Sequence, residues 1–154
     1  MLFRSRVGKK QTLLQINPEH GWAAGLELTR DHIELIAIDA AGAVRAQTRF
    51  TWDGNLALLG QLLSERWRML VAMWNLPIDR LLGAGVGVSG IVDTPRGKLL
   101  QSTMFDMRDF DLAGMLGDAM QTPVLVDHNA NLAALAELRL GAAREHSQIG
   151  RAHV

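Results

Sequence analysis

The spacing of the hydrophobic residues changes near Asn55, and this change limits the folds open to the chain. Three strand-like runs precede it, at residues 22–28, 32–39 and 43–52. Short turns join these runs, which predicts an antiparallel meander. From Asn55 to Asn75 the apolar residues instead recur at the three- and four-residue spacing of one helical face, and Pro77 ends that pattern. A meander followed by a long helix is therefore predicted.

The second half of the chain alternates between buried strands and helices. Its predicted elements are a glycine-rich strand at 81–88, a hairpin whose TPRG turn joins 91–92 to 99–100, a short helix at 111–120, a strand at 122–126 and a final helix from 129 that stops at 141. Strands that are followed by helices and return to further strands imply an α/β fold with a mixed sheet and helices on its faces.

The composition fits one globular domain. Hydrophobic residues make up 48% of the 154 residues and charged residues 21%, which is too apolar for a disordered chain. Lys+Arg and Asp+Glu both number 16, and this zero net charge argues against a nucleic-acid surface spread over the domain. The chain has no cysteine and its histidines show no metal-ligand spacing, so no metal site is expected. The four tryptophans, at 22, 52, 67 and 74, are interpreted as core and lobe-packing residues.

No segment has the length and apolar character of a signal peptide or a membrane span. We therefore expect no membrane contact and a cytoplasmic location. The basic start, MLFRSRVGKK, admits two interpretations, a phosphate contact or a solvated tail. Four charges without aromatic residues specify little, which favours the tail.

The stretch VLVDHNANLAALAE, residues 124–137, places polar side chains where an apolar strand gives way to a helix. Asp127, His128 and Asn129 lie at the carboxyl end of that strand, where open α/β sheets bind ligands. The backbone N–H groups of the following helix point the same way. The alternative is ordinary capping, in which Asp127 or Asn129 caps the helix and His128 faces solvent. Local sequence leaves these two interpretations open.

The stretch GAGVGVSG, residues 83–90, matches a GxGxxG pattern only loosely. A dinucleotide loop should follow a first strand and open a helix, whereas these glycines lie within and just after a strand that leads into a hairpin. We therefore favour close strand packing or an open ligand cleft over a nucleotide loop.

Taken together, several segments resemble the ROK family, whose name stands for repressors, open reading frames and sugar kinases. The segments are GLELTRD, GVGVSGIVDTPRG, STMFDMRDFDL, PVLVDHNANLAALAE and LGAAR, which span roughly residues 12–146 in the family's order. The resemblance implies the actin-like, ribonuclease H-like ATPase fold, of which this chain would be the first lobe only. It also implies a sugar or sugar derivative as the ligand.

The base position departs from the family pattern. In the family's kinases, the carboxylate that removes a proton from the sugar hydroxyl is the Asp of an ENDAN segment, and its counterpart here is Asn129. An amide has no basic lone pair near neutral pH, so Asn129 cannot act as that base. Asp127, at the place of the family's Glu, is the one surrogate carboxylate. We therefore expect no catalytic residue and no sugar kinase activity.

The phosphate loop departs as well. The family has Asp-x-Gly-Gly-Thr after the first strand, whereas this chain has Glu27, Leu28, Thr29, Arg30 and Asp31. The close backbone approach that glycines allow is lost, and Asp31 adds negative charge where phosphate would lie. We expect this loop to be degenerate.

A third departure lies in the sugar site, where Met104 replaces the sugar-contacting Asn of the family's SPNL segment. The predicted ligand-binding residues are Ser89, Gly90, Met104, His128 and Asn129.

One further segment indicates a branch of the family. QTLLQINPEHGWAAGLEL resembles the connector that joins a winged helix-turn-helix to the sugar-binding part of ROK repressors. We divide the chain into a basic tail and connector at 1–20, an N-terminal lobe at 21–146 and a non-native tail at 147–154. DNA would then be bound only through a helix-turn-helix domain outside this chain.

The resemblance also yields expectations about what lies beyond the chain. The second lobe, with its zinc site, is expected to lie outside it, so no cofactor is expected within it. The ends MLFRS and IGRAHV are interpreted as non-native because they resemble translated sequencing adaptors. Without a second lobe, the final helix and the glycine-rich strand should be partly exposed. The full-length protein is expected to be a homo-oligomer.

Three functions remain in competition. The first is the effector-sensing domain of a ROK-type transcriptional regulator. The second is a sugar kinase of the same family that transfers phosphate from ATP and uses a displaced carboxylate such as Asp127. The third is an oligomerisation scaffold that has lost its ligand.

Overall fold

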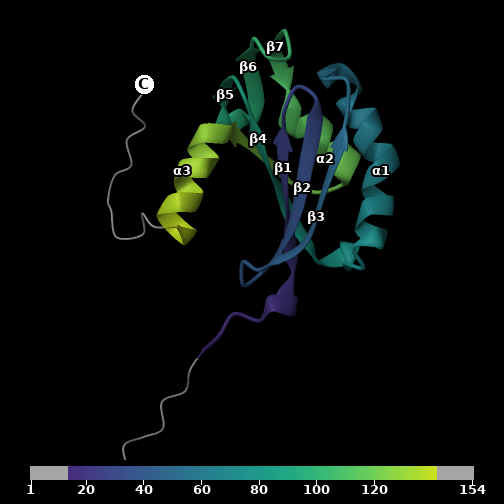
Figure 1. Cartoon of the computed structure of the whole chain (residues 1–154), viewed down its shortest axis with the longest axis vertical. Helices are drawn as coiled ribbons and strands as arrows, with labels where there is room; N and C mark the ends of the chain where they lie inside the picture. Colours follow the sequence, from purple (N-terminus) through teal and green to yellow (C-terminus); the bar gives the residue numbers. More distant parts are fainter. Residues whose placement is uncertain (1–13, 142–154) are drawn as a thin grey trace, which may run out of the picture.

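The computed structural model describes residues 14–141, which form a five-stranded sheet, a three-stranded sheet and three α-helices (Figure 1). The five-stranded sheet has the order β3-β2-β1-β4-β8, with bounds β1 Trp22–Leu28, β2 His32–Asp39, β3 Val44–Thr51, β4 Leu81–Val88 and β8 Val124–His128. The smaller sheet is β5 Ile91–Asp93, β6 Lys98–Ser102 and β7 Met107–Asp111. The helices are α1 Leu59–Met73, α2 Leu112–Met120 and α3 Asn129–Leu140.

The main sheet is mixed, as predicted. β1, β2 and β3 form the antiparallel meander, while β4 pairs parallel to β1 and β8 pairs parallel to β4. Parallel strands place their carboxyl ends at the same edge, and here Leu28 is in register with Val88, which is in register with His128. The chain segments that follow these three strands therefore begin side by side.

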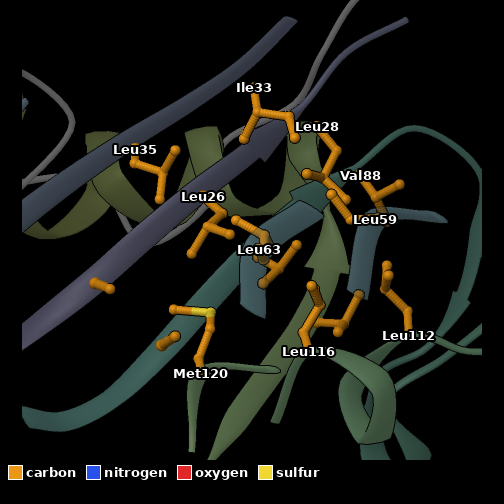
Figure 2. Close-up of a cluster of buried hydrophobic side chains, with 14 of the residues drawn as sticks. Leu26, Leu28, Ile33, Leu35, Leu59, Leu63, Val88, Leu112, Leu116 and Met120 are labelled. Carbon is orange, nitrogen blue, oxygen red and sulfur yellow. The ribbon is translucent and has the colours of Figure 1, made fainter. Parts of the chain in front are cut away.

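The two faces of this sheet are covered differently. In Figure 1, α1 and α2 lie together against one face, and α3 projects on the other side of the sheet. The first face carries the core, where side chains from β1, β2, β4, α1 and α2 point toward one another (Figure 2). Alternate residues of β1 and β2 are buried in it, which matches the alternation in the sequence. By contrast, α3 contains no buried residue, in agreement with the expected exposure of the final helix.

Two local features differ from the predicted elements. The helix predicted from Asn55 begins with a 3-10 turn, Leu56–Leu58, in which the Ala57 N–H donates to the Asn55 side chain, and the α-helix itself starts at Leu59. The strand β7, Met107–Asp111, was not predicted. It is a polar edge strand, so it lacks the apolar alternation by which strands are recognised. Its backbone is also irregular, since Asp109 adopts a positive φ of 46°.

The described part of the chain contains no helix that is both long and apolar enough to cross a membrane. The predicted tail at 147–154 and most of the predicted segment at 1–20 fall outside the described residues. Of that segment, residues 18–20 form a 3-10 turn, and Arg80 Nη1 holds it by donating to Glu19 O at 2.9 Å.

Candidate functional site

Polar groups gather at the edge where the parallel strands end. The turn after β1 brings Thr29 and Asp31 there, the turn after β4 brings Ser89 and Gly90, and β8 ends at His128. The hairpin of β5 and β6 lies beside them, with contacts from both β5 and its 3-10 turn to β8. The predicted site residues of three segments thus meet at one edge because the sheet is parallel there.

A hollow of about 580 Å³ lies at this edge. Its lining residues are Gly90, Val92, Thr94, Asp127, His128, Ala130 and Asn131. Three of the residues singled out in the sequence, Gly90, Asp127 and His128, therefore line one space. The volume is within the range of small-molecule sites.

Asp127 accepts two hydrogen bonds through its Oδ1, from the His128 backbone N–H at 2.7 Å and from Asn131 Nδ2 at 3.0 Å. Partial burial alone would raise the pKa of Asp127, but these hydrogen bonds and the nearby Thr94 hydroxyl outweigh it and hold the pKa below its ordinary value. Asp127 is therefore ionised near neutral pH, and its Oδ1 is already engaged.

His128 is the N-cap of α3. Its Nδ1 accepts from the Ala130 backbone N–H at 3.0 Å, and its backbone is extended at φ −64° and ψ 133°. Of the two interpretations left open by the sequence, capping by Asp127 or Asn129 does not hold, because the Asp127 carboxylate accepts from the His128 N–H and from Asn131, while the His128 imidazole accepts from the Ala130 amide. An Nδ1 that accepts this bond carries no proton, so the ring proton lies on Nε2, where it can be donated to a ligand.

Asn129, at the predicted base position, is the first residue of α3. A Cβ built on Gly87 would lie 3.7 Å from the Asn129 Cβ, so Asn129 sits over the glycine-rich strand. Its side-chain amide makes no hydrogen bond to the rest of residues 14–141. It is thus available to a ligand hydroxyl as donor or acceptor, although it does not line the hollow itself.

The turn after β4 is fixed from the small sheet. Ser102 is buried on β6, and its Oγ donates to Ser89 O at 2.7 Å. Gly90 has a φ of 149°, and a Cβ there would lie 2.5 Å from Gln101 O, so only glycine fits. Sequence reasoning missed Ser102 because nothing local shows that β6 faces this turn.

Two other partners of the site, Thr94 and Asn131, were also missed. Asn131 lies four residues after Asp127, a spacing at which side chains across a helix start can meet, so the sequence did carry a signal for it. Thr94 comes from the hairpin turn 33 positions away, and only the tertiary fold brings it to Asp127. Met104, by contrast, packs against the hydrophobic core and is not among the lining residues of the hollow.

The turn between β1 and β2 is closed by its own side chains. Thr29 Oγ1 lies 2.7 Å from His32 Nδ1 and 3.1 Å from Asp31 Oδ1, and the indole N–H of Trp52 donates to Thr29 O at 2.8 Å. The hydrogen bond from His32, with a smaller one from Thr29, lowers the pKa of Asp31 and keeps it anionic. The hydroxyl of this turn is therefore engaged, and its carboxylate carries a negative charge.

Within residues 14–141, no group of three or more His, Asp or Glu side chains is placed to hold a metal ion. The expectations about cofactors therefore stay predictions.

Comparison with known proteins gives a match to the family model described as "ROK family" over residues 23–152. A xylose repressor of Bacillus subtilis is 25% identical over 147 residues, which cover 95% of this chain and 38% of the relative. A glucokinase of Halalkalibacterium halodurans is 37% identical over 124 residues, which cover 79% of this chain and 37% of the relative. The chain thus spans little more than a third of the length of these relatives.

Among solved structures, a ROK family transcriptional regulator described as a homologue of the E. coli MLC protein superposes with a TM-score of 0.72. The identity is 21%, and the match covers 82% of this chain and 32% of that structure. The similarity establishes the fold, and the predicted actin-like architecture is confirmed.

Proposed function

Because the chain belongs to the ROK family, we propose that it forms part of the effector-sensing region of a transcriptional regulator, and that its effector is a sugar or sugar derivative. The site would hold the sugar through hydrogen bonds without transferring a phosphoryl group. DNA would be contacted by a separate domain outside these 154 residues, in the same compartment, the cytoplasm.

The proposal rests on two side chains at the start of α3, the Asn129 amide and the Asp127 carboxylate. Asn129 offers an amide where a base is needed, and Asp127 is a weak base because its pKa lies below the ordinary value and its Oδ1 already accepts two hydrogen bonds. Proton removal from a sugar hydroxyl favours a base whose pKa lies near the working pH. A pair of this kind can bind hydroxyl groups but is poorly suited to activating one.

The relatives add support. The match to the xylose repressor of Bacillus subtilis covers 95% of this chain, whereas the match to the glucokinase covers 79%. The zero net charge argues against DNA contact by this part of the chain. We also propose a homo-oligomeric full-length protein, with any zinc bound outside these residues.

A sugar kinase is the second candidate, and the 37% identity to a glucokinase favours it. In that case Asp127 would have to move away from Thr94 and Asn131 to reach a sugar hydroxyl. The closed turn around Thr29 and Asp31 argues against it, because positioned phosphates are the main requirement of phosphoryl transfer.

The test combines thermal unfolding with a kinase assay on the purified chain. Xylose and glucose should be titrated to high concentration, since a ligand at about one hundred times its Kd stabilises the folded state by ~2.7 kcal/mol. We expect at least one sugar to raise Tm, with no phosphorylated sugar formed from ATP. Asn129→Ala should weaken the Tm shift, and Gln61→Ala, a polar residue exposed on α1, should leave it unchanged.

Each outcome separates the candidates. Phosphorylation that is abolished by Asp127→Asn would establish the kinase and reject the regulator. A protein that responds to no sugar, in either assay, would favour a scaffold that has lost its ligand.

A further inference from the structure

We infer that the hollow at the start of α3 accepts the uncharged form of its sugar ligand and discriminates against the phosphorylated form, with Asp127 as the residue that sets this specificity. The inference rests on the proposed function, because it concerns the chemical class of the effector. It follows from the charges at the site, which differ from those of a phosphate pocket.

The lining of the hollow contains no Lys or Arg. Of its seven described residues, Asp127 is the one carboxylate, and the His128 Nδ1 carries no proton where it accepts from the Ala130 N–H. The remaining polar groups are the Thr94 hydroxyl, the Asn131 amide and the His128 Nε2–H. These groups suit sugar hydroxyls, which both donate and accept, whereas a phosphate would approach a carboxylate without a neutralising cation.

The start of α3 would ordinarily favour an anion, since helix N-termini carry unpaired N–H groups and a positive partial charge. One of these N–H groups is already engaged, because the Ala130 N–H donates to the His128 imidazole. The Asp127 carboxylate accepts from the His128 N–H, at the residue just before the first turn of α3. A second anion at this helix start would therefore meet the negative charge of Asp127.

Cations close to the hollow in the chain are engaged elsewhere. Arg96, two residues after Thr94, donates to Asp93 Oδ2 at 3.1 Å, and Lys98 pairs with Asp109 at 3.1 Å. The neighbouring turn after β1 brings Arg30 but also Asp31, whose carboxylate is held in its anionic form by His32. The edge of the sheet thus offers a phosphate no net positive charge.

The experiment measures binding of matched sugars to the full 154-residue chain by isothermal titration calorimetry. The probes are glucose, mannose and N-acetylglucosamine, each beside its 6-phosphate. For any sugar that binds, we expect its 6-phosphate to bind at least about tenfold more weakly at low salt, as one like-charge contact near a protein surface can produce.

Two further measurements assign the discrimination to charge and to this residue. Asp127→Asn should bring the two affinities to within about threefold of each other, since it removes the repelling charge but keeps a hydrogen-bonding group. Asp118→Asn makes the same charge change on the exposed surface of α2. It should leave the ratio of the free-sugar affinity to the 6-phosphate affinity as in the unchanged protein. In the unchanged protein, raising NaCl from about 20 mM to about 500 mM should also narrow the ratio, because salt screens exposed charges; this arm does not depend on whether a variant folds.

The outcomes are distinguishable. A 6-phosphate that binds as tightly as its free sugar, or more tightly, overturns the inference and leaves the proposed sugar-sensing function standing. An unchanged ratio in Asp127→Asn and at high salt overturns the assignment to Asp127. If none of these free or phosphorylated sugars binds, this inference fails; the proposed function fails with it if xylose also leaves Tm unchanged.

Discussion

The two faces of the five-stranded sheet differ in how completely they are covered. The face under α1 and α2 is closely filled, and Leu26, Leu35 and Leu63 are at most 4% exposed. The opposite face carries a line of glycines on β4, and Leu125 beside them on β8 is 73% exposed. One face therefore supplies stability, and the other leaves space.

The glycines of the open face show where α3 contacts the sheet. A Cβ on Gly87 would come within 3.3 Å of Leu132 on α3, whereas a Cβ on its neighbour Gly85 would meet nothing within 4 Å. The helix thus rests on the sheet only near its own start, at the level of Asp127 and Asn129. The site lies where the two layers converge, and beyond it the face opens.

The largest expected effect tests the division of stability directly. Leu63→Ala on the filled face should lower the free energy of unfolding by about 2–5 kcal/mol, because it opens a cavity among residues that cannot collapse into it. Leu125→Ala deletes the same atoms on the open face and should change it by no more than ~0.5 kcal/mol. Urea unfolding followed by tryptophan fluorescence measures both. Equal losses in the two variants would mean that the open face is covered in solution.

Two glycine substitutions, one on the open face and one in the turn after β4, sharpen the comparison. Gly90→Ala should cost about 1–3 kcal/mol, because its φ of 149° is strained for alanine and its Cβ would lie 2.5 Å from Gln101 O. Gly85→Ala meets no neighbour and should be neutral within ~0.5 kcal/mol. The same urea unfolding measurement applies. A strongly destabilised Gly85→Ala would show that another group occupies the space above β4.

The filled face was the part that the sequence predicted well, and the reason is physical. Burial of one side of a strand gives its hydrophobic residues a period of two, and burial of one side of a helix gives them a period near 3.6. The elements β1, β2 and α1 could therefore be predicted from their own residues. The glycine-rich strand was also recognised, but its glycines admitted either packing or a cleft. The structure has both, with packing at Gly87 and open space at Gly85.

The site could be predicted from the sequence only in part. The positions of Asp127, His128 and Asn129 at a strand end followed from sequence, but their partners did not. Asp127 could equally have capped α3, but it accepts from Asn131 instead, and Thr94, which also lowers its pKa, arrives from a distant hairpin. Ser102 and its bond to Ser89 depend on how the small sheet docks. Hydrogen-bond partners that are far apart along the chain produce no periodic pattern in the sequence, so they could not be predicted from it.

A pair of tryptophans within the filled face gives a smaller expected effect. Trp22 and Trp67 are both 2% exposed, and their rings lie 6.0 Å apart. The Trp22 indole donates to Pro77 O at 2.7 Å, whereas Trp67 Nε1 is buried with no partner in the described chain. Trp22→Phe should therefore cost about 1 kcal/mol more than Trp67→Phe, since only the first loses a hydrogen bond. Equal costs would indicate that Trp67 has an acceptor in solution, such as a water molecule.

The smallest expected effect concerns acid stability at the open face. Because the pKa of Asp127 is lowered in the folded state, its hydrogen bonds stabilise the protein above the ordinary Asp pKa of 3.8, and that contribution is lost as the pH falls through the lowered folded pKa. Unfolding measured between neutral pH and pH ~3 should therefore show Asp127→Asn less stable than the unchanged protein near neutrality, with the difference shrinking in acid. Asp118→Asn removes a carboxylate that accepts no hydrogen bond from residues 14–141 and serves as the charge-matched control. A difference between Asp127→Asn and the unchanged protein that stays constant across this range would mean that the asparagine disturbs packing around α3, and that the charge of Asp127 contributes nothing to holding its start.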